Sequence, residues 1–438
     1  MSEHLSQHVV KLPHKELCLC VFNRATYARC KTLIYELSKQ PHISLTVILS
    51  SALLMEEFGN AADEYIKSSH EGNVQFELID IGYSDFTPYG MAKAASRVWD
   101  RLTDFFHAHN FDAVIVVADR FETLPAAAAA SYLNIPVIHI QGGETTGNLD
   151  DRIRHAVTKL SDYHFVSTDL AKSYVEAMGE DSKRVKRTGC PSIDLLRVNR
   201  IRRFRTKERY ILCIFHPETD SNDEAYEQTK VVLESVLEFC MQFGYRCYWF
   251  YPNPDPGRQH IVRLLDEVLS ANKAFLVKAI NKDPVLFLRQ FAAASFFIGN
   301  SSCGIRESSY LGLPAIDVGD RQAYRERAHN VISCPYDKDY IRAAMVKQRD
   351  AYRHPISRLY GVGKAGEAIT EAISLTEFTL KPTLTYPFTM KFKEKHFGEG
   401  RFKLHEKTIA YVAKQFRQGS RDSADSTACE RVTLPSES

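Results

Sequence analysis

The residues best suited to chemistry stand in short polar segments that follow apolar runs, and such runs predict buried strands. Asp119 and Arg120 follow the run Ala113–Val117. In an α/β domain, polar residues at the carboxyl end of a strand face the ligand crevice. Asp119 could take or give a proton there, and Arg120 could pair with it or with a phosphate. A structural Asp–Arg ion pair is the plain alternative, which these two residues alone do not exclude.

A second polar segment contains Gln141 and Glu144, on either side of a glycine pair that follows the run Val137–Ile140. Two glycines let the backbone approach a ligand closely. Without further context, the same residues are equally consistent with a tight turn. We therefore keep both interpretations for this segment.

A third segment carries two neighbouring carboxylates at the start of a predicted helix. Asn148 or Asp150 would cap that helix, and Asp151 would suit its first turn. The start of the helix is more readily explained by a role for one of the two aspartates than by a need for both. One of the two is therefore left for chemistry.

A turn rich in Gly, Asn and Ser joins a predicted strand, Ser295–Ile298, to a predicted helix, Gly304–Leu311. Ser301 and Ser302 lie in this turn, where free backbone N–H groups and the helix dipole attract phosphate. Glu307 stands one turn into the helix, and its carboxylate can accept two hydroxyl hydrogens, as a ribose requires. The segment predicts half of a nucleotide-diphosphate site. An ordinary Ser-capped helix is weighed evenly against it.

Three more polar residues also follow predicted strands. Arg24 lies just after the first apolar run, where a guanidinium can reach a phosphate in the cleft. His216 follows the run Tyr210–Phe215, and Asn253 follows Tyr245–Phe250. A lone histidine is usually structural, but one at a strand end near phosphate-binding turns is a stronger candidate.

Apolar runs alternate with amphipathic stretches over most of the chain, which predicts parallel sheets covered by helices on both faces. The alternation stops near Cys190–Lys207 and then restarts. We expect an α/β protein with two doubly wound, Rossmann-like domains and a ligand cleft between them. The expected boundaries are 1–190 and 208–360 for the domains, 361–378 for a C-terminal helix and 379–438 for a partly disordered extension. The predicted strands are Leu17–Phe22, Ser44–Ser50, Val74–Ile79, Ala113–Val117, Val137–Ile140, Tyr163–Val166, Tyr210–Phe215, Tyr245–Phe250, Phe275–Val277, Ser295–Ile298 and Ala315–Val318.

One glycine motif does not fit a nucleotide site. Gly361, Gly363 and Gly366 have the GxGxxG spacing, but no strand precedes them. The dinucleotide interpretation requires a strand before and a helix after the glycines within a βαβ unit, so we reject it.

Composition narrows the class of protein. The 438 residues have a net charge of +2, which predicts no nucleic-acid partner. We see no N-terminal signal-peptide pattern and no stretch apolar enough to cross a bilayer, so no membrane partner is expected. The ten cysteines show no CxxC spacing, which favours reduced thiols in the cytoplasm and no zinc site.

Six segments together resemble one known family: NRATY, ADRFETL, HIQGGETTGNLDDRIRHAVTKL, TGCPSID, YPNPDPG and IGNSSCGIRE. They resemble the hydrolysing UDP-N-acetylglucosamine 2-epimerases, which include bacterial sialic-acid pathway enzymes and the epimerase half of the bifunctional animal enzyme. The resemblance runs from about Leu17 to Thr376. It implies a glycosyltransferase-B fold, with the sugar nucleotide between two Rossmann-like domains.

The resemblance also implies a reaction: UDP-GlcNAc and water give ManNAc and UDP through a 2-acetamidoglucal, for sialic or other nonulosonic acid synthesis. It places Asp119 and Asp150 at catalytic carboxylate positions, with Gln141, Glu144 and His216 as further catalytic candidates. The implied substrate-binding residues are Arg24, Arg120, His216, Asn253, Ser301, Ser302, Glu307 and Arg321. These cationic and N–H groups can neutralise a diphosphate, so we expect no metal and no cofactor.

Four positions depart from the family pattern: Thr26, Ala28, Leu53 and Gln141. Many members have Glu in place of Gln141, and an amide cannot exchange a proton at neutral pH. Glu144, Asp119 or Asp150 would then take over that role. Two alternatives follow, namely the same chemistry on UDP-N,N′-diacetylbacillosamine or another UDP-HexNAc, and a catalytically weakened UDP-sugar-binding protein. We further expect a homodimer or homotetramer, with contacts through the first domain.

Overall fold

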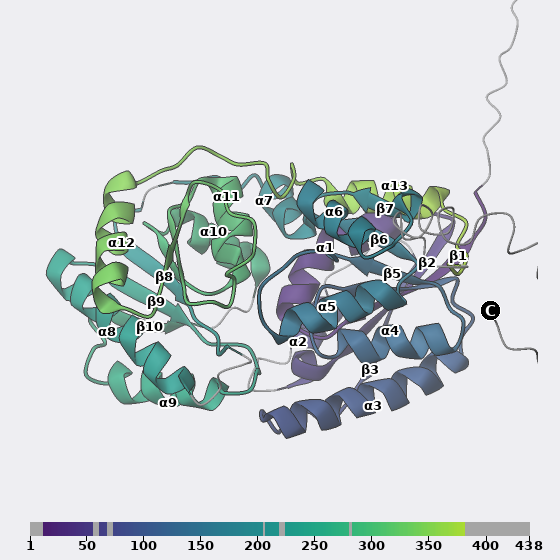
Figure 1. Ribbon diagram of the computed structural model, residues 1–438, viewed down its shortest axis with the longest axis horizontal. Coiled ribbons are helices and arrows are strands. Elements are labelled where there is room, and N and C mark those ends of the chain that lie inside the picture. The colour runs from purple at the N-terminus through teal and green to yellow at the C-terminus, as the bar shows by residue number, and fades with distance from the viewer. Residues whose placement is uncertain are drawn as a thin grey trace, which may run out of the picture. The chain divides into compact units, whose positions relative to one another are not determined.

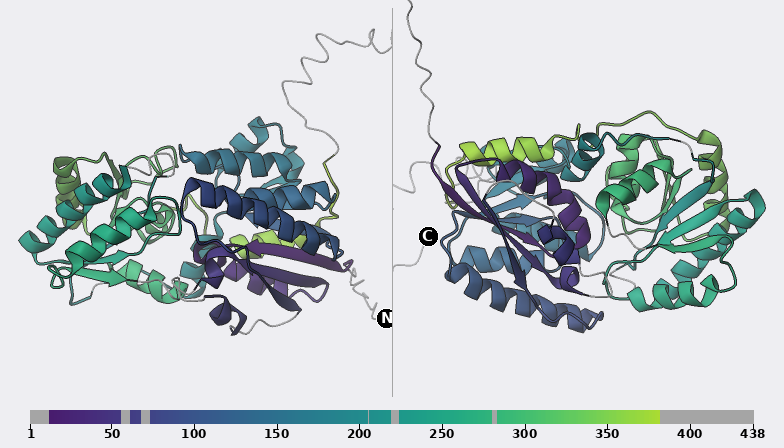
Figure 2. Two further views of the ribbon diagram at one scale, coloured as in Figure 1. Left: turned by 90° about the horizontal axis from the view of Figure 1, so that it is seen from below. Right: turned by 180° about the vertical axis from the view of Figure 1, so that it is seen from behind.

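The computed structural model describes residues 12–55, 61–67, 73–204, 206–218, 224–279 and 283–381. These residues form two parallel β-sheets with helices packed on both faces of each (Figures 1 and 2). The predicted doubly wound α/β architecture is confirmed. The predicted extension after Lys381 lies outside the described residues. Within the described ranges, no helix is long and apolar enough to cross a membrane.

The first sheet has seven parallel strands in the order β3-β2-β1-β4-β5-β6-β7. Its strands are β1 Lys15–Val21, β2 Ile43–Ser50, β3 Val74–Ile79, β4 Ala113–Val117, β5 Val137–Ile140, β6 Tyr163–Val166 and β7 Val185–Arg187. The helices on this part of the chain are α1 Arg24–Ser38, α2 Ala61–Lys67, α3 Pro88–His107, α4 Thr123–Tyr132, α5 Leu149–Leu160, α6 Asp169–Ala177 and α7 Asp194–Val198. The central strands are buried on both faces, which explains why they are continuous apolar runs.

The second sheet has six parallel strands in the order β10-β9-β8-β11-β12-β13. Its strands are β8 Tyr210–Ile214, β9 Arg246–Phe250, β10 Leu276–Ala279, β11 Phe297–Gly299, β12 Ala315–Val318 and β13 Val331–Cys334. Its helices are α8 Ala225–Phe243, α9 Arg258–Leu269, α10 Pro284–Ala293, α11 Arg306–Leu311 and α12 Lys338–Ala351. Both sheets reverse their strand order beside the first strand, at β1/β4 and at β8/β11. Ligands of such sheets bind at the carboxyl ends of the strands beside this reversal.

The last described helix, α13 Ala365–Leu375, returns to the first sheet and packs against α1 (Figure 1). Asp194 accepts hydrogen bonds from the backbone N–H groups of Ala365 at 3.0 Å and Gly366 at 2.7 Å, which fixes the start of the helix. A Cβ on Gly366 would lie 3.0 Å from the backbone nitrogen of Leu33 in α1. This glycine therefore permits close helix packing.

The structure corrects three details of the predicted elements. The edge strands β7 and β13 were not predicted, because they are short and only partly buried. The helix predicted for Gly304–Leu311 begins at Arg306, after a 3₁₀ turn at Ser302–Gly304. The C-terminal helix begins at Ala365, since the preceding glycines have positive φ angles.

Candidate active site

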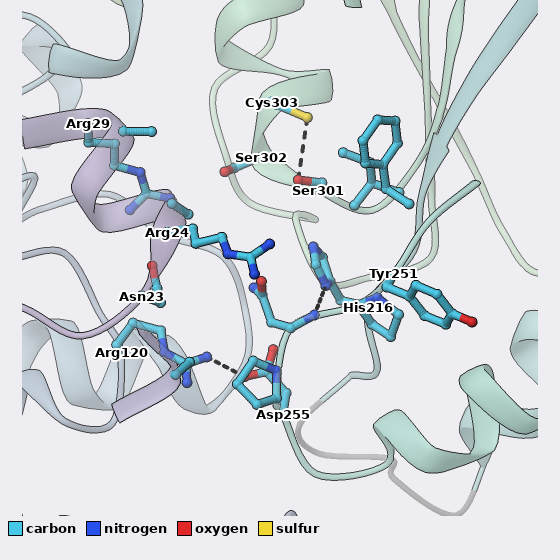
Figure 3. A pocket seen from close by; sticks show the side chains of 18 of the residues that line it. Asn23, Arg24, Arg29, Arg120, His216, Tyr251, Asp255, Ser301, Ser302 and Cys303 are labelled. Carbon is cyan, nitrogen blue, oxygen red and sulfur yellow. Dashed lines mark hydrogen bonds and ion pairs between the residues drawn. The ribbon is translucent and has the colours of Figure 1, made fainter. Parts of the chain in front are cut away.

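A pocket of about 430 Å³ lies where the loops after the strands of the two sheets meet (Figure 3). Arg24 and Arg120 enter it from the first sheet, opposite His216 and Ser301 from the second. Ten of the residues predicted from the sequence line this pocket: Arg24, Asp119, Arg120, Asp150, His216, Asn253, Ser301, Ser302, Glu307 and Arg321. Residues far apart in the chain thus meet at one site.

Asp119 is held as a carboxylate by a buried arginine. It follows β4, and its carboxylate forms an ion pair with Arg154 of α5, whose side chain is only 1% exposed. Arg154 also pairs with Asp151 and donates to the backbone oxygen of Glu144 at 2.6 Å. Burial alone would raise the pKa of Asp119, but the charge of Arg154 holds that pKa well below its usual range. Asp119 is therefore ionised at neutral pH.

Asp150 is the spare carboxylate that the sequence left unassigned. Asn148 caps α5 by accepting from the backbone N–H of Asp150 at 3.0 Å. Asp151 accepts from the backbone N–H groups of Thr146 and Gly147 and pairs with Arg154. The side chain of Asp150 takes no part in these contacts, and Asp150 lines the pocket.

The environment of Asp150 differs from that of Asp119. Burial and the nearby charge of Asp119 raise the pKa of Asp150 to about 6, against the opposing effect of Arg321. The guanidinium of Arg321 lies 3.9 Å from the Asp150 carboxylate. Two neighbouring carboxylates whose pKa values are pushed apart are typical of acid–base sites.

Glu144 and Gln141 do not line the pocket. The buried Glu144 carboxylate pairs with Arg306 at 2.5 Å and with Arg325, both on the second-sheet side. Burial would raise the pKa of Glu144, but these arginines lower it to about 2. Glu144 is therefore ionised at neutral pH, and its ion pairs link the first-sheet side to the second-sheet side. Because it is paired with two arginines and lies outside the pocket lining, it is unsuited to replace the family glutamate as a base.

Gln141 is buried directly after β5, in a left-handed backbone conformation with φ of 66°. Its amide donates to Cys190 Sγ at 2.8 Å. Thr26 and Leu53, two further departures from the family pattern, are also buried and do not line the pocket. Ala28, the fourth departure, does line it, so the pocket lining differs from the family pattern at Ala28 and not at the other three positions.

His216 presents a neutral donor. Burial lowers its pKa to about 3, so the ring is uncharged at neutral pH. Its Nδ1 accepts from the backbone N–H of Asn253 at 3.2 Å, which leaves the proton on Nε2. Asn300 fixes the His216 backbone through two hydrogen bonds, of 2.7 and 2.8 Å.

The turn after β11 has the features expected for oxygen-rich ligands. Neither Ser301 nor Ser302 caps a helix through its side chain, so the Ser-capped alternative is not observed. Glu307 has one carboxylate oxygen that is buried without a hydrogen-bond partner among the described residues. Burial raises the pKa of Glu307, and the positive charge of Arg306 opposes that rise.

Arg120 differs from expectation in its partners. It forms ion pairs with Glu122 and with Asp255, which follows β9, so its charge is already balanced across the pocket (Figure 3). Arg29 on α1 also lines the pocket and was missed in the sequence. Its helical spacing from Ala25, another lining residue, is the signal that could have identified it.

Among the described residues, no cluster of three or more His, Cys, Asp or Glu side chains could hold a metal ion. The site instead combines a neutral histidine and several arginines with four carboxylates, those of Asp119, Asp150, Asp255 and Glu307. This set can move a proton and stabilise a departing anion.

Comparisons with known proteins point to one family. Residues 35–374 match the model of the UDP-N-acetylglucosamine 2-epimerase family. A UDP-N,N′-diacetylbacillosamine 2-epimerase (hydrolyzing) from Legionella pneumophila is 29% identical over 353 residues, covering 78% of this chain and 91% of the relative. A UDP-N-acetylglucosamine 2-epimerase from Neisseria meningitidis is 29% identical over 335 residues, covering 74% and 85%.

The solved structures bear on the fold. The UDP-GlcNAc 2-epimerase of Methanocaldococcus jannaschii, in complex with UDP-GlcNAc and UDP, superposes with a TM-score of 0.68 at 17% identity, covering 82% of this chain and all of that one. The glycosyltransferase-B fold expected from the sequence is thereby confirmed. Because the family model spans most of the chain, this protein belongs to the UDP-N-acetylglucosamine 2-epimerase family.

Proposed function

We propose that this protein is a hydrolysing UDP-GlcNAc 2-epimerase of the cytoplasm, which forms ManNAc and UDP for nonulosonic acid synthesis. The observation that carries the proposal is the pair Asp119 and Asp150, which line one pocket but differ in pKa. A weakly acidic C–H bond next to the anomeric carbon needs a base whose pKa is near the working pH. Asp150 meets that requirement.

In the first step, the Asp150 carboxylate takes the proton from C2 of the sugar. The electrons of the C2–H bond form the C1=C2 bond, and those of the C1–O bond leave with UDP. The product is 2-acetamidoglucal. Asp119, held ionised by Arg154, stabilises positive charge that develops at C1 as UDP departs.

The departing UDP carries negative charge into a cluster of donors. Arg24, Arg29 and Arg321 line the pocket, and the Nε2–H of the neutral His216 adds an uncharged donor. Arg120 contributes less to the diphosphate, because Glu122 and Asp255 already balance its charge. Such fixed donors stabilise the charge that forms on the leaving group.

In the second step, water adds across the double bond. Its oxygen bonds to C1, and a proton reaches C2 on the face opposite to the one it left, which gives ManNAc. The proton held by Asp150 passes to solvent, so the atoms balance as UDP-GlcNAc plus water giving ManNAc plus UDP. Gln141 takes no part, because it is buried away from the pocket lining.

Proton NMR of UDP-GlcNAc incubated with the protein in D₂O tests this proposal. We expect free UDP together with ManNAc that carries deuterium at C2. UDP-GlcNAc that binds but stays intact would refute the hydrolysing activity on this sugar. Free UDP with undeuterated product would refute the elimination step.

A second candidate is the same reaction on UDP-N,N′-diacetylbacillosamine. The part of the pocket lining that the first sheet's segments supply includes five apolar residues, namely Ala52, Met91, Phe121, Leu149 and Ile153. Such a lining favours the C6 methyl group of a 6-deoxy sugar, since a hydroxyl buried there would lack a partner. The Legionella relative carries the name of this activity.

The two candidates differ in a competition experiment. When both UDP-sugars are supplied together at equal concentration, the ratio of products gives the ratio of kcat/KM values. For this second candidate we expect a ratio of about ten or more in favour of the diacetamido sugar. UDP-GlcNAc would lack the apolar contact of the C6 methyl group and would bury a hydroxyl without a partner. A ratio favouring UDP-GlcNAc would exclude this second candidate.

A further inference from the structure

Asn23 lines the pocket but has no part in the reaction proposed above. It follows β1 and caps α1. Its side-chain Oδ1 accepts from the backbone N–H of Thr26 at 2.7 Å, and its backbone oxygen accepts from the N–H of Tyr27 at 3.0 Å. The residue is only 5% exposed. A polar side chain buried at a ligand site needs a partner at each of its polar ends.

The cap determines which end of the Asn23 amide is left for a ligand. Because an oxygen must accept from the Thr26 N–H, the nitrogen is at the other end of the planar group. Among the described residues, this nitrogen makes no hydrogen bond. Asn23 lies between Arg24 and Arg120 on the first-sheet side of the pocket (Figure 3). Its two N–H donors are therefore available to a ligand there.

Capping alone does not explain an asparagine at this position. Aspartate and serine cap helices about as well as asparagine does, and the helix dipole also favours the charge of aspartate. Asparagine differs from both in adding a pair of uncharged N–H donors at the end of the side chain. An anionic oxygen only accepts hydrogen bonds, and an aspartate would repel it. Such an oxygen is therefore the ligand atom that Asn23 suits best.

The other groups in the pocket indicate which anionic oxygen this is. In the proposed function, the turn with Ser301 and Ser302 holds the nucleoside end of the UDP-sugar, and Asp119 and Asp150 act on the sugar. The β-phosphate joins these two parts, so it is the phosphate nearer to the first sheet. There it meets the start of α1, a helix of 15 residues whose N-terminus attracts phosphate.

We propose that Asn23 is a further substrate-binding residue, whose amide donates a hydrogen bond to the β-phosphate of the UDP-sugar and of the departing UDP. The inference rests on the proposed function, because it takes a nucleoside diphosphate as the ligand. One side chain then both starts α1 and binds the phosphate at its N-terminus. It supplies a donor beside Arg120, whose own charge is already balanced by Glu122 and Asp255.

The test compares binding of UDP with binding of UMP, which lacks the β-phosphate, by calorimetry on the full chain. Asn23→Ser keeps an uncharged capping oxygen but loses the amide donors. We expect it to weaken UDP binding by about 10-fold, the worth of one hydrogen bond to a charged group, and to leave UMP binding nearly unchanged. Asn23→Asp also keeps the cap but adds a like charge, so it should weaken UDP binding further. The urea midpoint of unfolding should stay the same in both variants, because both retain the cap.

The cap of α12 supplies the matched control. Asp337 accepts from the backbone N–H groups of Asp339 and Tyr340 and does not line the pocket. Asp337→Asn makes the reverse exchange at a capping position, so binding of both nucleotides should be unchanged.

Unchanged UDP binding in Asn23→Ser would overturn the inference, and so would equal weakening of UDP and UMP. The two proposals can fail separately. A protein that binds UDP but leaves UDP-GlcNAc intact refutes the proposed reaction, while the comparison of UDP with UMP still decides the role of Asn23. If the unaltered protein binds no UDP, both proposals are wrong.

Discussion

Replacing Arg321 by glutamine should move the acid limb of the kcat/KM profile to higher pH. In the proposed mechanism, this limb belongs to Asp150, which must be ionised to take a proton from C2 and whose pKa is about 6. Arg321 is the cation that opposes further elevation of that pKa. When Arg321 is removed, burial and the charge of Asp119 raise the pKa of Asp150 further, because this opposing cation is gone.

The separation of the two groups sets the size of the effect. At 3.9 Å, two unit charges interact by about 4 kcal/mol at an effective dielectric constant of about 20. Since about 1.4 kcal/mol corresponds to one pKa unit, the ceiling is about 3 units. The Asp150 side chain is 26% exposed, and solvent screening reduces the shift, so we expect about 1 to 2 units.

The assay is UDP release measured from pH 5 to about 9 in buffers of constant ionic strength. Arg321→Lys is the matched control, because it keeps the positive charge and should leave the limb near its original pH. If Arg321→Gln only removes a contact to the substrate diphosphate, kcat/KM falls by the same factor at every pH. The electrostatic effect on Asp150 instead moves the midpoint of the acid limb. An unmoved midpoint in Arg321→Gln would refute the assignment of the limb to Asp150.

Three further predictions concern the carboxylates. Asp150→Asn should lower kcat by about 10²- to 10⁴-fold with little change in UDP affinity, and turnover within a few-fold of the original would rule out Asp150 as the base. Asp119→Asn should fold and bind UDP but lose most turnover; near-normal turnover would make Asp119 structural. Glu144→Gln should lower the free energy of unfolding by about 3 kcal/mol in urea titrations at pH 7, because it leaves two buried arginines underpaired. Glu144 has a lower pKa folded than unfolded, so this stabilisation should be complete above about pH 5 and be lost as the pH falls toward 2; an equal deficit at every pH would contradict the ion-pair explanation.

Much of the fold was predictable from the sequence because strands buried on both faces must be continuous apolar runs. The short edge strands Val185–Arg187 and Val331–Cys334 were not predictable in this way, because their residues are partly exposed and leave no such run. The C-terminal helix was recognised, but its return to the first sheet depends on Asp194 and on the close approach that Gly366 allows.

The candidate site was predictable for a related reason. Parallel strands end at one edge of a sheet, so polar residues that follow them gather there, and this principle alone brought Asp119, His216 and Asn253 to one pocket. It failed for Gln141 and Glu144, since the turn after β5 carries both side chains away from the pocket lining. Sequence position places a residue at a strand end but does not determine the direction of its side chain.

The sequence by itself determined the residue types, the two doubly wound sheets and the edge at which the polar groups collect. Only the tertiary structure decided which aspartate stays charged and which can exchange a proton. Asp119 and Asp150 have the same side chain, and the difference arises from Arg154 against one and from burial beside a like charge for the other. A pKa depends on surroundings supplied by distant parts of the chain, and these exist only once it is folded.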